Sequence, residues 1–220
     1  MKTYEVMGIK VKDHSVREAL RLTRDYLSDN SPSVVYFLTK GTLLEAADAD
    51  DYRAFLETEA DITMIATPDI FKAAGVEDKG RAREIDRNLY LKGLLRLLSR
   101  EHRRVYLMSQ TPEQMSDLKH LLLTFENTLQ VAGACDNAEA GAAEDVTNDI
   151  NTVTPYAVFA VLTGKDGADF VNAAKKFMNS RLIVVLQPEL LNIREDGSVR
   201  QGLMARLSGR LFTRIAGRYK

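Results

Sequence analysis

Residues 34–47, VVYFLTKGTLLEAA, contain the pattern that decides the fold class. The first five are strand-forming apolar residues without alternation, which is typical of a strand buried on both faces of a parallel sheet. The turn Thr39-Lys40-Gly41-Thr42 follows, and a helical pattern begins directly after it. At the carboxyl end of a parallel strand, the N–H groups of such a turn, the helix dipole and Lys40 favour an anionic ligand.

The same order of strand, Thr- or Ser-bearing turn and helix recurs three more times. Strands of this kind are expected at residues 62–66, 104–108 and 156–162. Strands that alternate with helices of about ten residues indicate right-handed βαβ units. We therefore predict an α/β fold with a Rossmann-like parallel sheet flanked by helices. Residues 1–198 are expected to form this single domain, and residues 199–220 a basic helical appendage.

The composition indicates a soluble globular protein. Of 220 residues, 45% are hydrophobic and 28% are charged, and the net charge of −1 excludes a globally basic nucleic-acid binder. The single Cys135 excludes an internal disulfide and agrees with a reducing cytoplasm. No stretch approaches the ~18 apolar residues that span a membrane. We expect a cytoplasmic protein, with peripheral attachment at the inner face of the cell membrane left open.

The C-terminal segment 203–220, LMARLSGRLFTRIAGRYK, is basic and amphipathic. Arg206, Arg210, Arg214 and Arg218 recur every four residues, with Leu, Phe and Ile between them. Such a helix suits an anionic membrane surface or a groove on a partner. A terminal helix that packs on its own sheet and exposes its arginines to solvent explains the pattern equally well.

The turns supply the candidate site residues, because the carboxyl ends of parallel strands meet along one edge of the sheet. Asp69 stands in the first turn of the helix that follows the second of these strands. It is either a first-turn acid that favours the helix dipole or a general base. The candidates for substrate binding are Thr39, Lys40, Thr67, Ser109 and Thr163.

Two motifs with a superficial likeness to ligand sites are assigned no such role. The TGKDG turn at residues 163–167 lacks the G-x-x-x-x-G-K-[ST] spacing, so we interpret it as an ordinary turn between strand and helix. Asp48 and Asp50 form a D-x-D pattern, but positions i and i+2 of a helix point to different faces. We expect neither a metal site nor a cofactor.

Three further predictions concern single residues and one short segment. His14, His102 and His120 are interpreted as solvated histidines, because none has a second ligand at metal spacing. Residues 76–86, VEDKGRAREID, are predicted to form a loop, since they hold seven charges and little apolar material. Thr67 is predicted to cap the helix that follows it.

Taken in order, several segments resemble the WecG/TagA/CpsF glycosyltransferases. They are MGIKV at 7–11, VVYFLT at 34–39, EADITMI at 59–65, RRVYLMSQTPEQ at 103–114 and PYAVFAVLTG at 155–164. These bacterial enzymes pass a hexosyl or N-acetylmannosaminyl unit from a UDP-sugar to a polyprenyl-linked acceptor in cell-surface polysaccharide synthesis. The resemblance covers nearly the whole chain and implies the same donor and acceptor classes. It also makes Arg206, Arg210, Arg214 and Arg218 candidates for contact with the acceptor.

Residues that the family uses in its site are replaced here. Where the family has Asn, a small residue and Glu, this chain has Thr39, Lys40 and Gly41. The family's Pro-Asp-Gly, whose Asp is regarded as the catalytic base, corresponds to residues 65–67. Asp69 takes that role only after a shift of three positions.

The resemblance therefore leaves several functions open. The chain is a glycosyltransferase with Asp69 as its base, or a non-catalytic relative that binds a nucleotide sugar or a partner enzyme, or a membrane-associated scaffold. Ser109 and Gln110 replace a Gly-Gly pair of the family, whereas Arg214 matches a family Arg near the C-terminus. A homo-oligomer also stays open, and no nucleic-acid partner is expected.

Overall fold

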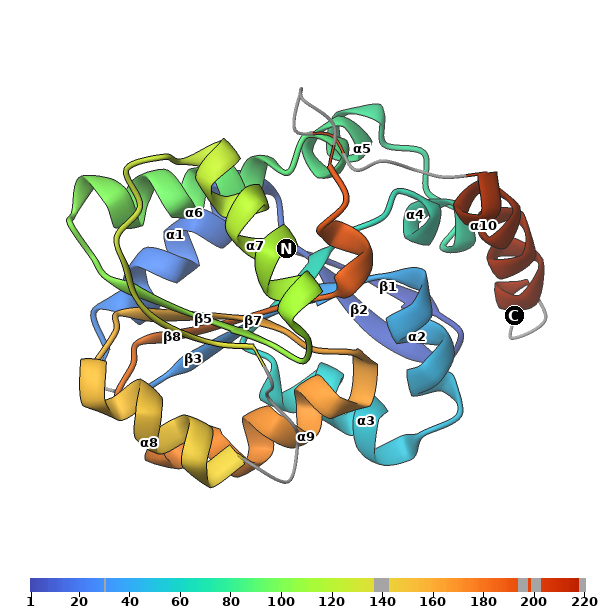
Figure 1. Ribbon diagram of the computed structural model, residues 1–220. Helices are drawn as coiled ribbons and strands as arrows, with labels where there is room; N and C mark the ends of the chain where they lie inside the picture. Colours follow the sequence, from blue (N-terminus) through green and yellow to red (C-terminus); the bar gives the residue numbers. More distant parts are fainter. Residues whose placement is uncertain (30, 137–142, 194–197, 199–202, 218–220) are drawn as a thin grey trace.

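A six-stranded parallel sheet lies at the centre of the computed structural model, which confirms the predicted α/β fold (Figure 1). The strand order is β4-β3-β8-β7-β5-β6, and a separate antiparallel hairpin, β1-β2, lies beside β4. The strands are β1 (Lys2–Val6), β2 (Ile9–Asp13), β3 (Ser33–Leu38), β4 (Ile62–Ile65), β5 (Val105–Ser109), β6 (Val131–Cys135), β7 (Ala157–Val161) and β8 (Leu182–Leu186).

Helices cover both faces of the sheet. In Figure 1, α1, α6 and α7 lie above it, and α3, α8 and α9 lie below it. The structure describes residues 1–29, 31–136, 143–193, 198 and 203–217. The helices are α1 (Val16–Leu27), α2 (Lys40–Ala47), α3 (Asp50–Ala54) with a π-helical turn at Phe55–Glu59, α4 (Asp69–Ala73), α5 (Lys79–Asp86), α6 (Leu89–Arg100), α7 (Pro112–Phe125), α8 (Ala143–Val153), α9 (Gly164–Ala174), α10 (Leu203–Ala216) and short 3-10 turns at Lys175–Phe177 and Pro188–Leu190.

The strand β3 shows why these strands lack alternation. All six of its residues are buried. Val34, Tyr36 and Leu38 point into the core shared with α2, α3 and α9, whereas Val35 and Phe37 point into the core shared with α1 and α6. Because each large apolar side chain buried in this way contributes about 1.5–3 kcal/mol, both faces stabilise the sheet.

The chain changes direction within the sheet between two neighbouring strands. β5 and β7 are neighbours in the sheet. The strand that follows β5 along the chain is β6, which lies on the far side of β5, and the strand that follows β7 is β8, which lies on the far side of β7. The helices after these strands, α7 and α9, consequently cover opposite faces (Figure 1). Ligands of open α/β sheets bind at the carboxyl ends of strands where such a reversal occurs.

Residues 79–86 form the helix α5, so the prediction of a loop for residues 76–86 is wrong over most of that stretch. Its cap is Asp78, whose side chain accepts a hydrogen bond from the backbone N–H of Arg81 at 2.9 Å. Ile85 is buried, and Arg81 forms an ion pair with Asp13 of β2. The segment has little apolar pattern, and the ion pair of Arg81 with Asp13 holds it against β2 instead.

Thr67 does not cap α4. Pro68 occupies the N-cap position without a side-chain hydrogen bond, and Oγ1 of Thr67 is buried with no hydrogen-bond partner among the described residues. Instead, the carbonyl of Thr67 accepts a hydrogen bond from the N–H of Ile70 at 3.2 Å. The predicted capping bond is therefore replaced by a backbone bond.

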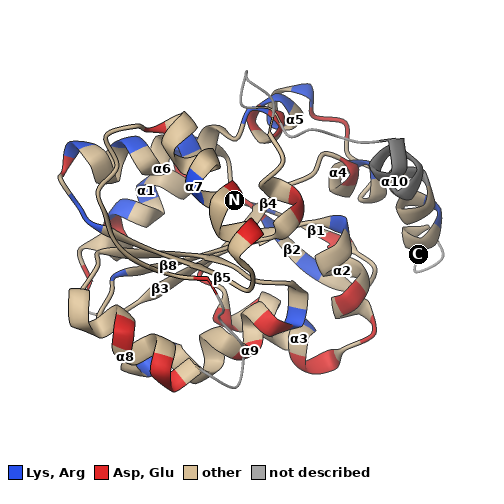
Figure 2. Ribbon diagram, viewed as in Figure 1, with Lys and Arg blue, Asp and Glu red and all other residues tan. Residues whose placement is uncertain are grey.

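The helices on the two faces of the sheet differ in charge. The helix α6 contains three basic residues and no acidic one, and α8 contains three acidic residues and no basic one. Figure 2 shows blue on α6 and red on α8, whereas α1 and α5 carry both colours. The surface is therefore polarised although the net charge of the chain is close to zero.

We expect Gly133→Ala in β6 to destabilise the fold. A Cβ atom at this position would lie 2.8 Å from the ring of the buried Tyr106. This ring cannot withdraw easily, because its hydroxyl donates a hydrogen bond to Asp149. Urea denaturation should show a loss of about 1–3 kcal/mol in the free energy of unfolding, as for other overpacked sites.

Gly217→Ala is the matched control for this change. Its added Cβ atom would lie 3.5 Å from its nearest neighbours, an ordinary contact distance. The substitution should change stability by no more than about 0.5 kcal/mol. Equal stability of the two variants would contradict the assignment of Gly133 to the Tyr106 contact.

Candidate functional site

The turns after β3 and β4 bring Lys40 and Asp69 together. Nζ of Lys40 lies 3.7 Å from Oδ2 of Asp69, and the two side chains are 18% and 19% exposed. Oδ1 of Asp69 accepts a hydrogen bond from Nζ of Lys72 at 3.2 Å. One partly shielded carboxylate therefore lies between two ammonium groups at adjacent strand ends.

The helix α10 closes over this carboxylate. A Cβ atom on Gly209 would lie 2.5 Å from Oδ2 of Asp69, so only glycine allows α10 to approach this closely. Phe212 of the same helix is buried in the core that α2 and α4 share. The C-terminal segment thus packs against the sheet edge where the candidate site lies.

The arginines of this helix are described only in part. The side chain of Arg214 is exposed to solvent. Those of Arg206 and Arg210, and the whole of Arg218, lie outside the described residues. The predicted contact of these arginines with a membrane or an acceptor stays a prediction.

Two predicted site hydroxyls are buried and hydrogen-bonded within their own turns. Thr39 caps α2, since its Oγ1 accepts a hydrogen bond from the N–H of Thr42 at 3.3 Å. Ser109 is fully buried, and its Oγ donates to the carbonyl oxygen of Thr111 at 2.9 Å. Both side chains therefore stabilise the backbone of the turns at the carboxyl edge of the sheet.

Gln110, which was not among the site residues predicted from the sequence, joins the turns after β5 and β7. Its Oε1 accepts hydrogen bonds from the N–H and the Oγ1 of Thr163 at 3.2 and 2.9 Å. Its Nε2 donates to Oδ2 of Asp166 at 3.0 Å. The only sequence signal was a long polar side chain where the resembled family has glycine, at the position where the sheet reverses.

A carboxylate of the chain itself occupies the N-terminus of α9. Oε1 of Glu45 accepts a hydrogen bond from the N–H of Lys165 at 3.1 Å. The other oxygen of Glu45 lies where a Cβ of Gly164 would be, and Gly164 has a φ of +34°. Helix N-termini favour anions, and Glu45 supplies one here. The anion at the TGKDG turn is therefore supplied by the chain itself, through the carboxylate of Glu45.

Buried tyrosine hydroxyls also stabilise this turn through hydrogen bonds. The hydroxyl of Tyr36 donates to the carbonyl of Gly164 at 2.5 Å and lies 2.9 Å from the hydroxyl of Tyr52. Burial raises the pKa of both phenols well above the usual value, so they stay neutral. Oε1 of Gln187, at the end of β8, accepts a hydrogen bond from the N–H of Gly164 at 3.0 Å.

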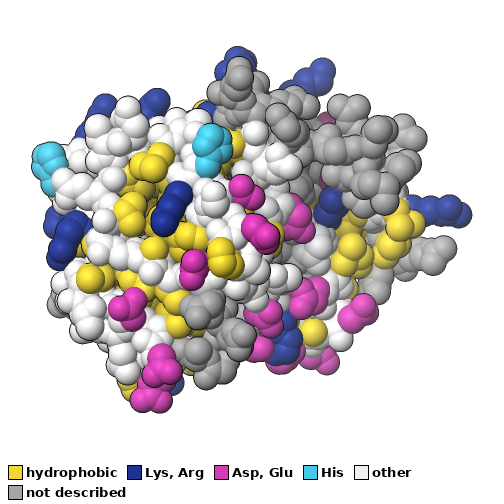
Figure 3. Space-filling model, viewed as in Figure 1, with side chains coloured by type: hydrophobic (Ala, Val, Ile, Leu, Met, Phe, Trp, Pro, Cys, Tyr) yellow, Lys and Arg dark blue, Asp and Glu magenta, His cyan; other side chains and the backbone are white. Residues whose placement is uncertain are grey.

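The surface around α3 and α9 is acidic. Figure 3 shows acidic side chains gathered over these helices on the face in view. Nζ of Lys165 lies 2.7 Å from Asp51 and 3.0 Å from Asp169, so its charge is offset by two carboxylates. An anionic ligand is disfavoured on this side, which leaves Lys40 as the better placed cation at the edge.

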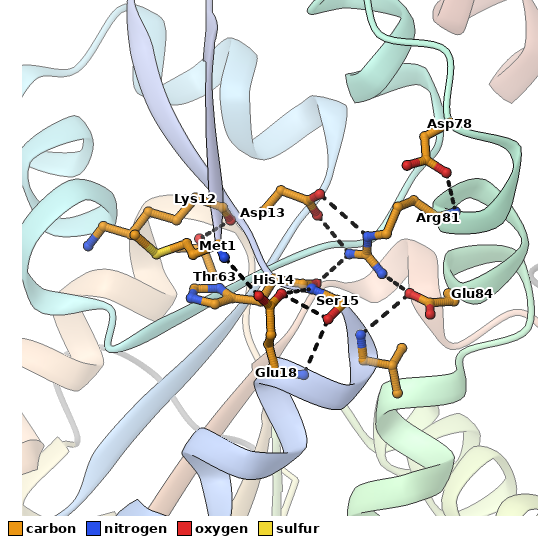
Figure 4. A network of polar contacts seen from close by, with 11 residues as sticks. Met1, Lys12, Asp13, His14, Ser15, Glu18, Thr63, Asp78, Arg81 and Glu84 are labelled. Carbon is orange, nitrogen blue, oxygen red and sulfur yellow. Dashed lines mark hydrogen bonds and ion pairs between the residues drawn. The ribbon is translucent and has the colours of Figure 1, made fainter.

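A second polar cluster lies on the other side of β4 and ties α5 to β2 (Figure 4). The guanidinium of Arg81 donates to Oδ1 of Asp13 at 2.7 Å, to a carboxylate oxygen of Glu84 and to the carbonyl oxygen of His14. The side chains of Arg81 and Asp13 are only 11% and 5% exposed. Such a desolvated pair requires both partners, so it fixes the position of α5.

His14 is buried in this cluster, so its interpretation as a solvated histidine is wrong. It is 4% exposed, and its Nδ1 has no hydrogen-bond partner among the described residues. Burial lowers the pKa of His14, and a hydrogen bond with the backbone of Thr63 opposes this shift. The buried imidazole is therefore favoured in its neutral form.

The D-x-D pattern is divided between two helices. Asp48 is the C-cap residue of α2, and Asp50 begins α3 and lies 3.5 Å from Arg53. Among the described residues, no group of three His, Cys, Asp or Glu side chains lies close enough together to hold a metal ion.

Comparison with known proteins adds one match. The model of the glycosyl transferase WecG/TagA/CpsF family matches residues 4–186, which include the whole sheet and every turn described above. No curated protein matches the chain. None of the helices in the described part of the chain is long and apolar enough to cross a membrane.

The buried His14 generates a prediction on pH. The unfolded chain, in which His14 has its ordinary pKa of 6.5, binds the proton more readily than the folded chain. The contribution of neutral His14 to stability is therefore present above pH 6.5 and is lost as the pH falls below it. For one proton, the free energy of unfolding falls by at most about 1.4 kcal/mol per pH unit.

His14→Gln should reduce this loss of stability at low pH. Urea denaturation at about pH 7.5 and about pH 5.5 measures it, because the slope of the unfolding free energy against pH reports the number of protons bound on unfolding. His120→Gln, at an exposed position, is the control and should keep the slope of the parent protein. An unchanged slope in His14→Gln would contradict the assignment.

Proposed function

Because the chain belongs to the glycosyl transferase WecG/TagA/CpsF family, we propose that it transfers a hexosyl or N-acetylhexosaminyl unit from a UDP-sugar to a polyprenyl-linked acceptor. The observation that carries this proposal is the pair formed by Lys40 and Asp69, 3.7 Å apart at adjacent strand ends. A diphosphate donor needs a cation, and an acceptor hydroxyl needs a base. This pair supplies one of each.

In the proposed reaction, the acceptor oxygen bonds to the anomeric carbon of the sugar while the bond from that carbon to the diphosphate breaks. UDP leaves with the electron pair, and the carboxylate of Asp69 takes the acceptor proton. Lys40 stabilises the negative charge that develops on the diphosphate. Thr67, Ser109 and Thr163 complete the turns of the same edge, and no metal is part of this proposal.

A second candidate function is binding of a nucleotide sugar, or of a partner enzyme, without turnover. Two observations favour it. The helix α10 packs on the carboxylate of Asp69 through Gly209, and Glu45 fills the N-terminus of α9. Both features restrict the space in which a donor and an acceptor would meet.

The proposed place of action is the cytoplasmic face of the cell membrane, where the chain would associate peripherally or act as a scaffold. The exposed Arg214 on α10 supports contact with an anionic surface. Cell-surface polysaccharide synthesis supplies a lipid-linked acceptor at that membrane.

We expect Asp69→Asn to lower the turnover of UDP-sugar, since loss of a general base costs about 10²- to 10⁴-fold. The assay incubates the purified full-length protein with a panel of UDP-sugars and lipid-pyrophosphate acceptors and measures released UDP. Asp117→Asn, at an exposed position on α7, is the matched control and should keep full activity. Binding of a UDP-sugar without UDP release under any condition would favour the second function.

Lys40→Ala should weaken the binding of UDP-sugar by about 10- to 100-fold, because charge-assisted hydrogen bonds to phosphate are lost. Lys72→Ala is the control: Lys72 contacts the same carboxylate but is 67% exposed. Its removal should change affinity by less than about fivefold. Equal losses in the two variants, measured by calorimetry with UDP, would argue against a donor contact by Lys40.

A further inference from the structure

A groove of about 690 Å³ runs along α1 towards the start of α6. Its apolar floor includes Leu20 and Leu89, and Leu89 is 38% exposed. Its rim carries Arg17, Arg21 and Arg24, whose spacing places them on one face of α1. The groove thus combines an apolar floor with a row of exposed guanidinium groups.

The groove is positively charged because its two acids are paired, whereas two of its three arginines form no ion pair with the residues that the structure describes. Glu18 accepts a hydrogen bond from the N-terminal amine of Met1 at 2.8 Å, and Glu84 pairs with Arg81 (Figure 4). Arg17 and Arg24 have no ion pair with any of the residues that the structure describes. Arg21 lies 3.9 Å from Asp25, but both are exposed, and such pairs are weak.

This groove opens towards an apolar cavity. The two share the residues Val16, Glu84 and Leu89. The cavity measures about 20 Å³, room for about one water molecule, and is lined mainly by side chains of β3, β4, α5 and α6. Its lining also includes Ala66, at the end of β4 and three residues before Asp69. The exposed Leu89 lines both the groove and the cavity.

We propose that this groove binds an anionic amphiphile, with its phosphate or diphosphate head on Arg17, Arg21 and Arg24 and its hydrocarbon chain along the apolar floor at Leu20 and Leu89. An acidic peptide or free phosphate would match the arginines but would leave the apolar floor of the groove unused. Resting on the proposed function, the inference assigns the prenyl phosphate end of the acceptor to this groove.

Calorimetry on the full-length protein tests this site with three probes: farnesyl diphosphate, inorganic pyrophosphate and farnesol. Because the head and the chain contribute together, farnesyl diphosphate should bind at least about tenfold more tightly than either single-feature probe. Charge reversal at two rim positions, Arg21→Glu with Arg24→Glu, should weaken farnesyl diphosphate by at least about tenfold. Leu89→Ser should weaken farnesyl diphosphate and leave pyrophosphate unchanged.

Lys176→Glu is the matched charge control, at an exposed position in the 3-10 turn that directly follows α9. It should bind farnesyl diphosphate as the parent protein does, and circular dichroism establishes that each variant is folded. The inference is overturned if farnesyl diphosphate binds no more tightly than pyrophosphate, or if Lys176→Glu weakens it as much as the rim variants. It is also overturned if the rim variants bind phosphatidylglycerol vesicles more weakly but bind farnesyl diphosphate as the parent protein does. That result would indicate a membrane contact.

The UDP-sugar assay separates this inference from the proposed function. Farnesyl diphosphate binding through the groove, without any UDP release, would refute the transfer reaction and leave the site in place. Turnover of UDP-sugar with lipid acceptors that the rim and Leu89 variants do not affect would refute the site and leave the reaction in place.

Discussion

Burial of the parallel sheet on both faces is the constraint on which the rest of the structure depends. Because β3, β5, β7 and β8 have no solvent-facing side, their side chains fill two separate cores, and helices must cover each. Apart from the hydroxyls of Ser33, Tyr36, Tyr106 and Ser109, polar chemistry is thereby excluded from these strands. It is confined to the turns at the carboxyl edge, where backbone groups and helix N-termini remain accessible.

At that edge the protein satisfies much of its polar chemistry internally. Glu45 supplies an anion to the N-terminus of α9, and Gln110 bridges the turns of β5 and β7. The pair of Lys40 and Asp69 remains partly exposed beneath α10. The candidate site is therefore narrow, and its accessible chemistry is concentrated at the β3 and β4 end of the sheet.

The polar cluster of Arg81 connects the fold to the groove on α1. By pairing with Asp13 and Glu84, Arg81 fixes α5 against β2 and removes one carboxylate from the electrostatics of the groove. The same contacts leave the arginines of α1 without strong partners. A structural ion pair thus contributes to the charge of the groove, which Glu84 itself helps to line.

The sequence by itself determined the fold class, because unbroken apolar strands followed by polar turns leave few arrangements other than a parallel sheet with helices on both faces. It also located Lys40 and Asp69 at strand ends. Only the tertiary structure decided that His14 is buried, that α5 is helical and that Glu45 and Gln110 belong to the edge. These features depend on ion pairs and hydrogen bonds between residues distant in sequence, and local periodicity carries no information about such partners.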